Sequence, residues 1–269
     1  MIPGSIRNSS MLQVVKAPAQ RIRIGRVGWT LISLLALIAI WEISALIAQS
    51  RYLPGPLAVV QVMVREAEAG ELWSNIAATL IRVAFSFVVA MFIGSAIGIA
   101  LGRNPGADRF FDAWLIFFLN LPALVIIVLC YIWFGLTEVA AVTAVAVNKI
   151  PNVAVTMREG TRSLSKDLEE MAQIYRFGWW KTMRHVTLPQ LAPYFAAAAR
   201  SGLALVWKIV LVVEAFGRSD GVGHQLNIAF QLFDVPMILA YALAFIVVVQ
   251  LIETLILQPI IARANKWRR

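Results

Sequence analysis

Charged residues are scarce in this sequence, and the side chains that build metal and redox sites are scarcer. Asp, Glu, Lys and Arg make up 14% of the 269 residues, whereas hydrophobic residues make up 60%. A soluble domain has about 25% charged and about 45–50% apolar residues, so this composition predicts an integral membrane protein. A single cysteine, Cys130, excludes a disulfide within the chain. The two histidines, His185 and His224, belong to no cluster with metal-ligand spacing, so we expect no metal site.

The sequence also lacks the motifs of an enzyme that uses nucleotides. No G-x-x-x-x-G-K-S/T stretch occurs, so the chain has no P-loop of its own. A membrane-embedded enzyme usually needs clustered His, Asp or Ser groups, and these are missing. An ion-driven transporter should carry intramembrane acids at paired positions of two repeats, and Glu42 and Glu253 support that poorly. Both classes remain as alternatives to the function inferred below.

Six apolar segments are long enough to cross a bilayer. A helix rises 1.5 Å per residue, so about 20 residues span a hydrocarbon core of about 30 Å. The sequence therefore predicts an all-α integral membrane protein with about six transmembrane helices. We expect one membrane domain, residues 29–262, between a cytoplasmic tail, residues 1–28, and a basic C-terminal tail, residues 263–269. The expected spans are residues 29–48, 75–101, 111–134, 139–155, 192–213 and 237–261.

The net charge of +9 follows from where Lys and Arg lie relative to these spans. Of the 24 basic residues, 17 fall in the termini, in residues 102–112 and in residues 157–189. Three basic residues, Arg51, Arg65 and Arg218, fall in loops on the other side. Cytoplasmic loops of membrane proteins are enriched in Lys and Arg, so both termini and residues 157–189 are predicted to be cytoplasmic. This asymmetry explains the charge without a nucleic acid partner.

A stripe of small residues runs along the second expected span. Small side chains that recur every four residues allow another helix to approach closely in lipid. We expect the stripe to pack against another helix of the same chain, and a seam between two copies is the alternative. The members are Ser86, Ala90, Gly94, Gly98 and Gly102.

Residues 214–236 interrupt the apolar pattern between the last two spans. They hold Gly217, then Gly221-Val222-Gly223, then an apolar stretch from His224 to Phe233 that is about half the length of a span. Irregular backbone at membrane depth is tolerated only against protein or a water-filled cavity. The pattern favours a re-entrant or interfacial helix that acts as a gate, with Gly221, Gly223 and His224 in the gate segment. A plain external loop is the alternative.

Residues 157–189 form a long amphipathic interruption between the fourth and fifth spans. From Leu168 to Val186, apolar residues recur every three or four positions, which predicts one helical face. Gly178 is expected to divide the run into two short helices. Such a segment could lie on lipid headgroups or dock in a groove of a soluble partner. The apolar residues are Leu168, Met171, Tyr175, Trp179, Met183 and Val186.

Several motifs in this order resemble those of a known family. Glu170-Met171-Ala172, closed by Leu188-Pro189, resembles the EAA loop of permease subunits of bacterial binding-protein-dependent ABC importers. Met171 replaces an alanine of that pattern, and Arg176 stands where a glycine is expected. Residues 50–265 resemble the sulfonate, nitrate and taurine branch. The other matching residues are Thr79-Leu80-Ile81-Arg82, Leu121-Pro122-Ala123, Trp133-Phe134-Gly135, Glu214 and Gly221-Val222-Gly223.

The resemblance implies a type I ABC importer permease in the bacterial inner membrane, without catalytic residues of its own. ATP and Mg²⁺ would bind to a partner ATPase dimer in the cytoplasm. A periplasmic or lipid-anchored solute-binding protein and a second permease copy, in a homodimer, would complete the transporter. Residues 157–189 would contain the coupling helix that lies in a groove of the ATPase. Its contact residues would be Glu169, Glu170, Ala172, Tyr175, Gly178, Trp179, Leu188 and Pro189.

Charged residues inside the expected spans are costly unless they pair or face a cavity. Lys208 lies deep in the fifth span, and Arg200 lies in its cytoplasmic half. These two cations, with Glu214, are expected to line a path for a small anionic solute such as a sulfonate, nitrate or taurine. The alternative is a structural ion pair of Lys208 with Glu42, Glu214 or Glu253. Lys149, in the fourth span, is close enough to the cytoplasmic end to snorkel.

Overall fold

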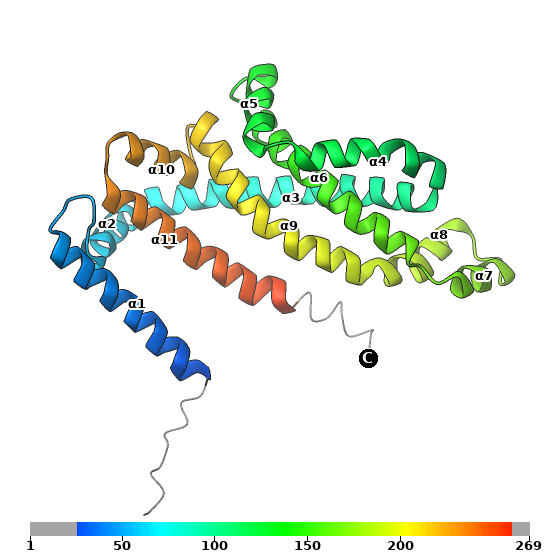
Figure 1. Cartoon of the computed structure of the whole chain (residues 1–269), viewed down its shortest axis with the longest axis horizontal. Helices are drawn as coiled ribbons and strands as arrows, with labels where there is room; N and C mark the ends of the chain where they lie inside the picture. The colour runs from blue at the N-terminus through cyan, green and yellow to red at the C-terminus, as the bar shows by residue number, and fades with distance from the viewer. Residues whose placement is uncertain (1–25, 260–269) are drawn as a thin grey trace, which may run out of the picture.

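The computed structural model describes residues 26–259 (Figure 1). Within these residues all regular structure is helical, as the composition predicts. The predicted tail of residues 263–269, most of the tail of residues 1–28 and the last residues of the sixth span lie outside the described part. The elements are α1 (Arg26–Ala48), α2 (Pro56–Glu68), α3 (Glu71–Arg103), α4 (Pro105–Asn120), α5 (Ala123–Phe134), α6 (Glu138–Arg162), α7 (Lys166–Ile174), α8 (Trp179–Thr182), the π-helix η1 (Met183–Thr187), α9 (Leu188–Gly217), α10 (Val222–Gln231), α11 (Val235–Ile252) and the π-helix η2 (Glu253–Leu257).

Long apolar helices dominate the chain. Five segments of residues 26–259 are long and apolar enough to cross a membrane, and the bent pair of α4 and α5 gives a sixth candidate. This agrees with the prediction of about six spans. Large apolar side chains such as Phe92 and Ile132 are exposed on the outer faces, which suits contact with lipid. The five segments are Gly28–Ala48, Glu71–Arg103, Glu138–Arg162, Trp179–Gly217 and Val235–Leu255.

The third expected span, residues 111–134, is not one straight helix, and the prediction was wrong in this respect. α4 ends at Asn120 and α5 begins at Ala123, and their axes differ by 95°. Leu121 and Pro122 between them are extended. Proline has no N–H to donate and disfavours helical conformation in the residue before it, so Leu121-Pro122 ends the first helix.

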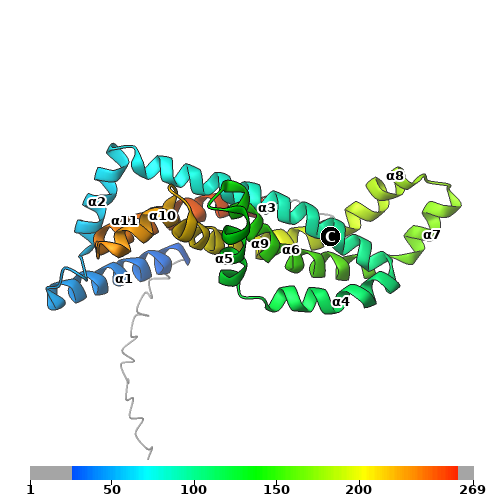
Figure 2. The same ribbon diagram turned by 90° about the horizontal axis from the view of Figure 1, so that it is seen from above.

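α3 and α6 lie side by side along much of their length (Figures 1 and 2). The stripe of small residues is the seam between them. A Cβ added to Gly94 would lie 2.7 Å from the Cβ of Val153, and one added to Gly98 would lie 2.5 Å from the backbone oxygen of Ala154. Only glycine allows this approach. The expected packing within one chain is therefore what the structure shows.

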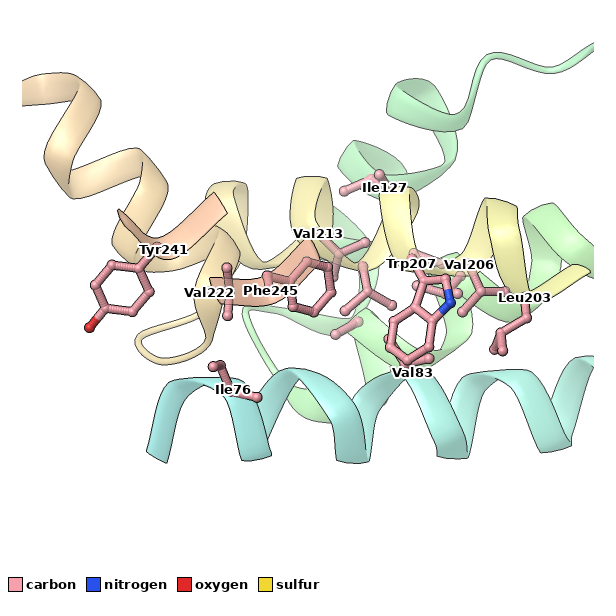
Figure 3. Packing of buried hydrophobic residues seen from close by; sticks show 14 of the residues in the cluster. Ile76, Val83, Ile127, Leu203, Val206, Trp207, Val213, Val222, Tyr241 and Phe245 are labelled. Atoms are coloured by element: carbon pink, nitrogen blue, oxygen red, sulfur yellow. The ribbon is translucent and has the colours of Figure 1, made fainter. Parts of the chain in front are cut away.

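The largest of the hydrophobic clusters in the described residues joins α3, α5, α6, α9, α10 and α11. α9 contributes Val206 and Trp207 to this cluster, and α11 contributes Tyr241 and Phe245 (Figure 3). α1 lies apart from this core, and none of its apolar residues between Gly28 and Ala48 is buried within the chain. The indole nitrogen of Trp41 donates to the carbonyl of Pro54 at 2.9 Å and ties α1 to the start of α2.

The two ends of the elongated molecule differ in content. α7 and α8 project from one end, whereas α2 and α10 lie at the other (Figures 1 and 2). α10 is the half-length helix expected after Gly221-Val222-Gly223. α9 joins the two ends, with Arg200 and Lys208 along its length and Glu214 near its α10 end.

Candidate functional site

Arg82 stands at the centre of a buried polar cluster at the α10 end of the molecule. Its Nε donates to Oε2 of Glu138 at 2.9 Å, and its Nη2 donates to Oε1 of the same carboxylate at 2.7 Å. Nη1 donates to Oε1 of Glu214 at 2.7 Å and to the carbonyl of Asp220 at 3.0 Å. Nη2 also donates to the Asp220 carboxylate. One guanidinium thus joins α3, the start of α6, the end of α9 and the turn before α10.

Glu214, which is 0% exposed, is satisfied from several directions. Its Oε2 accepts from the Thr79 hydroxyl and from the N–H of Gly223, both at 2.9 Å. A Cβ on Gly221 or Gly223 would collide with Glu214, and Gly221 has a positive φ of 102°. These facts explain both glycines of the Gly-Val-Gly motif. Both oxygens of this buried carboxylate therefore have hydrogen-bond donors within the chain.

The same cluster fixes the N-terminus of α10. The N–H of Gly221 donates to Oδ1 of Asn75 at 2.8 Å, and the N–H of Val222 donates to the Thr79 hydroxyl at 2.9 Å. Together with the Gly223 bond, this supplies acceptors for N–H groups that a helix start leaves without partners. α3 therefore holds the expected gate segment in place. We call Asn75, Thr79, Arg82, Glu138, Glu214, Arg218, Asp220 and the backbone of residues 221–223 the Arg82 cluster.

His224, the third residue predicted for the gate segment, lies outside these hydrogen bonds. It lines a cavity of about 340 Å³ beside the turn from α9 to α10, together with Arg218, Ser219 and Asn227. Arg218 is held by its own bonds to the carbonyl of Leu136 and to Glu138, both at 2.7 Å.

A second cavity, of about 320 Å³, lies between α9 and the end of α11. Both cations predicted for the solute path line it, and both are exposed in the single chain. Within residues 26–259 neither Arg200 nor Lys208 forms a hydrogen bond or an ion pair. We call this the α9–α11 cavity. Its lining residues are Arg200, Leu203, Ala204, Trp207, Lys208, Leu211, Phe245, Ile246, Val249, Gln250, Glu253 and Gln258.

Glu214 does not join the two cations with which it was grouped. It lies six residues after Lys208 and belongs to the Arg82 cluster rather than to the α9–α11 cavity. Among the described residues Lys208 is paired with none of Glu42, Glu214 and Glu253. Glu253 is the one acid that lines the cavity with it.

The segment expected to couple to a partner consists of α7, a turn, α8 and η1. Gly178 begins the second part as the residue before α8, so the expected division is confirmed. Arg176 has a positive φ of 50°, and its N–H donates to the carbonyl of Gln173 at 2.9 Å. The N–H of Phe177 donates to the carbonyl of Ala172 at 2.8 Å. These bonds form a Schellman motif, in which glycine is usual at the position of Arg176.

The turn breaks the continuous apolar face predicted for this segment. Val186 is buried, whereas Tyr175 is 70% and Trp179 is 69% exposed. Ala172 is buried, and Leu188 and Pro189 are exposed at the start of α9. Of the expected contact residues, Tyr175 and Trp179 thus present exposed aromatic side chains, whereas Ala172 is inaccessible to a partner. Neither Glu169 nor Glu170 has a hydrogen-bonding or ionic side-chain partner in the described part of the chain.

Residues 90–266 match the family model described as "Binding-protein-dependent transport system inner membrane component". The chain belongs to this family. An aliphatic sulfonates transport permease protein, SsuC, of Bacillus subtilis (strain 168) is 27% identical over 269 residues, with 98% of this chain and 96% of the relative covered. The taurine transport system permease protein TauC of Escherichia coli (strain K12) is 24% identical, with 84% of each covered. The bicarbonate transport system permease protein CmpB of Synechococcus elongatus is 26% identical, with 68% of this chain and 70% of the relative covered.

Solved structures of ABC importers share the fold. The MetNI methionine ABC transporter, in an inward-facing conformation, matches with a TM-score of 0.58 at 18% identity, covering 73% of this chain and 95% of that one. An amino acid ABC transporter matches with a TM-score of 0.59 at 19% identity, covering 74% and 97%. This likeness shows the fold alone, and it confirms the predicted type I permease architecture.

Sequence reasoning missed the polar contacts that tie the family's motifs together. Thr79, Arg82, Glu214 and the Gly-Val-Gly motif were identified separately, and the structure joins them in one cluster. At the α7 end, Arg158 and Arg162 of α6 bind Asp108 of α4, and Asp112 also binds Arg158 at 2.6 Å. Both pairs have the spacing i, i+4, which places each pair on one helix face and was the available signal.

Proposed function

We propose that this chain is the transmembrane subunit of an ATP-driven importer that moves a small anionic solute into the cytoplasm. The observation that carries the proposal is the projecting α7–α8 segment. It exposes Tyr175, Trp179 and Trp180 at one end of a membrane domain that has no P-loop. Exposed aromatic residues with free acidic neighbours are suited to a groove on a soluble partner. A separate ATPase subunit, which carries ATP and Mg²⁺, would occupy that surface.

The charge of the solute is inferred from the relatives and from the α9–α11 cavity. The relatives are named as permeases for sulfonates, taurine and bicarbonate. Arg200 and Lys208 line a cavity between two spans without any ion-pair partner in residues 26–259. Unpaired cations at this depth are costly unless they face water or an anion. An anion that passes along α9 would compensate them.

The complete transporter would contain two copies of this chain, two ATPase subunits and an external solute-binding protein. Contacts of η1 and α4 would pass ATPase motion to the spans. Arg103 at the end of α3 donates to the Thr187 hydroxyl of η1 at 2.9 Å, and Arg162, which ends α6 just before α7, binds Asp108 of α4. The Arg103–Thr187 hydrogen bond thus links η1 directly to α3, and the Arg162–Asp108 ion pair joins α6 to α4 beside the start of α7.

The proposal is tested by purifying the chain together with a candidate ABC ATPase subunit and measuring ATP-dependent uptake in proteoliposomes. Glu170→Lys should uncouple hydrolysis from uptake, because it reverses the charge of a free side chain on α7. Glu68→Lys makes the same change at an exposed site on α2, at the other end, and should leave coupling intact. Normal uptake with Glu170→Lys, or no ATPase bound to the unaltered chain, would refute the docking assignment.

We also propose that the α7–α8 end faces the cytoplasm and the α10 end faces the outside. The charge asymmetry of the sequence supports this orientation. In a Cys130→Ala background, Ser219→Cys should react with a thiol reagent added outside the cell, and Lys166→Cys should not. Ser219 is exposed and, unlike Asp220, makes no bond to Arg82, so the label does not disturb the cluster. Labelling of Lys166→Cys alone would reverse the assignment.

A further inference from the structure

We propose that the α9–α11 cavity is a transit site for an organic monoanion with an apolar body, in which Lys208 and Arg200 bind the headgroup and the Trp207–Phe245 wall binds the carbon chain. This inference rests on the proposed function and narrows its solute class. It separates organic anions, such as alkanesulfonates, from inorganic anions, such as nitrate and bicarbonate.

The charges of the cavity match a monoanion. Arg200, Lys208 and Glu253 are the ionisable groups among the residues that line it, which gives a net charge of about +1 at neutral pH. None of the three forms an ion pair within residues 26–259. The cations are therefore free to bind a ligand, in contrast to Arg82, whose donors are bound by carboxylates.

The spacing of the cations suits passage rather than tight capture. Arg200, Ala204 and Lys208 are four residues apart and lie along one face of α9, so the Cα atoms of the two cationic residues are about 12 Å apart along the axis. We infer that each cation offers a separate site for a sulfonate or carboxylate group. The anion would contact Lys208 first and Arg200 second on its way to the cytoplasmic end. Conduction requires sites that bind weakly enough to release, and two successive single-cation sites meet that need.

The walls between the cations are apolar and aromatic. Trp207 and Phe245 pack against each other (Figure 3), edge to face with ring centroids 5.8 Å apart. Both residues line the cavity. The volume of about 320 Å³ equals that of roughly ten water molecules, which exceeds what an inorganic oxyanion fills. Each methylene buried on such a wall should tighten binding about fourfold. An inorganic anion gains nothing from these walls.

The first test measures binding to the full-length chain in lipid nanodiscs, without a solute-binding protein that would impose its own selection. The ligands are methanesulfonate, butanesulfonate and nitrate, with a thermal shift or calorimetry as the readout. We expect affinity to rise about fourfold per methylene, so butanesulfonate should bind about sixtyfold more tightly than methanesulfonate. Equal affinities for the two sulfonates, or nitrate binding as tight as that of butanesulfonate, would overturn the inference.

Matched variants locate the binding in this cavity. Ala204→Leu fills the space between the cations and should weaken butanesulfonate binding at least tenfold while methanesulfonate changes little. Ala197→Leu places the same side chain on an exposed position of α9 outside the cavity and should change neither. Lys208→Met should weaken both sulfonates, Lys208→Arg should retain them, and Arg109→Met should serve as the control for lost charge. Equal effects of the two leucine variants would refute the site.

The outcomes separate this inference from the proposed function. If uptake depends on ATP but affinity does not depend on the length of the ligand's carbon chain, the importer assignment stands and the organic-anion site is refuted. If affinity rises with the length of the ligand's carbon chain but no ATP-dependent uptake is found, the binding site stands and the proposed transport function is refuted. If Ala204→Leu instead displaces a co-purified lipid, or dissociates two copies of the chain, the cavity holds that occupant and the inference fails.

Discussion

Glu214 and Lys208 lie six residues apart on α9 and differ in both burial and hydrogen bonding. Glu214 is fully buried and accepts hydrogen bonds from Arg82, Thr79 and Gly223. Lys208 is exposed in the chain and has no partner among residues 26–259. The Arg82 cluster is thus a region in which the chain satisfies its own charges, whereas the α9–α11 cavity and the α7–α8 segment leave polar and aromatic groups for something else.

This difference separates stability from function. Removing one member of a self-satisfied cluster leaves a buried charge alone, so the cost appears in folding. Removing a group that has no internal partner takes little away from the folded chain, so the cost appears in binding or transport. Each prediction below tests on which side of that division a residue lies.

The largest effect is expected for Arg82→Met. It would leave Glu214 buried without its cation, which should cost about 3–5 kcal/mol of unfolding free energy. Thermal unfolding in detergent and the yield of folded protein measure the loss. The double variant Arg82→Met with Glu214→Gln should regain part of it, because the stranded charge is removed. A stable Arg82→Met chain would show that the cluster is not structural.

Lys149→Met tests a residue that fits neither region. Lys149 is 1% exposed and has no partner in the described part of the chain, and Gly202 of α9 packs against its side chain. Removing a buried, unpaired ammonium should raise the unfolding free energy by about 1–3 kcal/mol. Lys208→Met, at an exposed position, should change it by less than about 0.5 kcal/mol.

A Lys149→Met chain that unfolds more easily would show that its ammonium has a partner beyond the described residues or in another copy. If the Lys149→Met chain is more stable but no longer supports uptake, Lys149 acts in transport and lies next to the solute.

The α9–α11 cavity and the α7–α8 segment could be predicted from the sequence better than the Arg82 cluster. Hydropathy located the spans and the polar α7–α8 segment, because both signals are local. Arg82 binds Glu138 and Glu214 across 56 and 132 residues, and no local pattern joins partners that far apart. The bend at Leu121-Pro122 was missed because hydropathy carries no direction, so two apolar helices meeting at 95° look like one span.

Trp179→Ala addresses the open α7–α8 segment. Exposed aromatic residues that dock in a partner groove are typical binding hot spots, so the loss should weaken ATPase binding by about 2 kcal/mol, or roughly thirtyfold. The unfolding temperature of the isolated chain should stay the same, because Trp179 is largely exposed. Trp29→Ala removes an equally exposed tryptophan from α1 and should leave ATPase binding intact. If Trp179→Ala lowers the stability of the chain and leaves ATPase binding unchanged, Trp179 has a structural role and does not contact the ATPase.

The smallest effect concerns Arg176, which ends α7 within the open segment. The Schellman bonds of Arg176 and Phe177 require the positive φ of 50° at this position. A residue with a Cβ pays about 1–2 kcal/mol there, and glycine avoids that strain at an entropic cost of about 0.5–1 kcal/mol in the unfolded chain. Arg176→Gly should therefore stabilise the turn by up to about 1 kcal/mol, measured as slower amide exchange at Phe177.

Arg176→Ala removes the same charge and keeps the strain, so it should give no such gain. Gly178 has ordinary extended angles, and no atom outside its chain neighbours lies within 4 Å of the position that a Cβ would take. Gly178→Ala should therefore also stabilise the protein slightly, by restricting the unfolded chain. If glycine stabilises the turn at position 176 and alanine is tolerated at position 178, the turn has the geometry of the EAA loop, with Arg176 in place of the glycine of that loop. Protection gained in Arg176→Ala as large as in Arg176→Gly would show that charge, and not backbone strain, governs this turn.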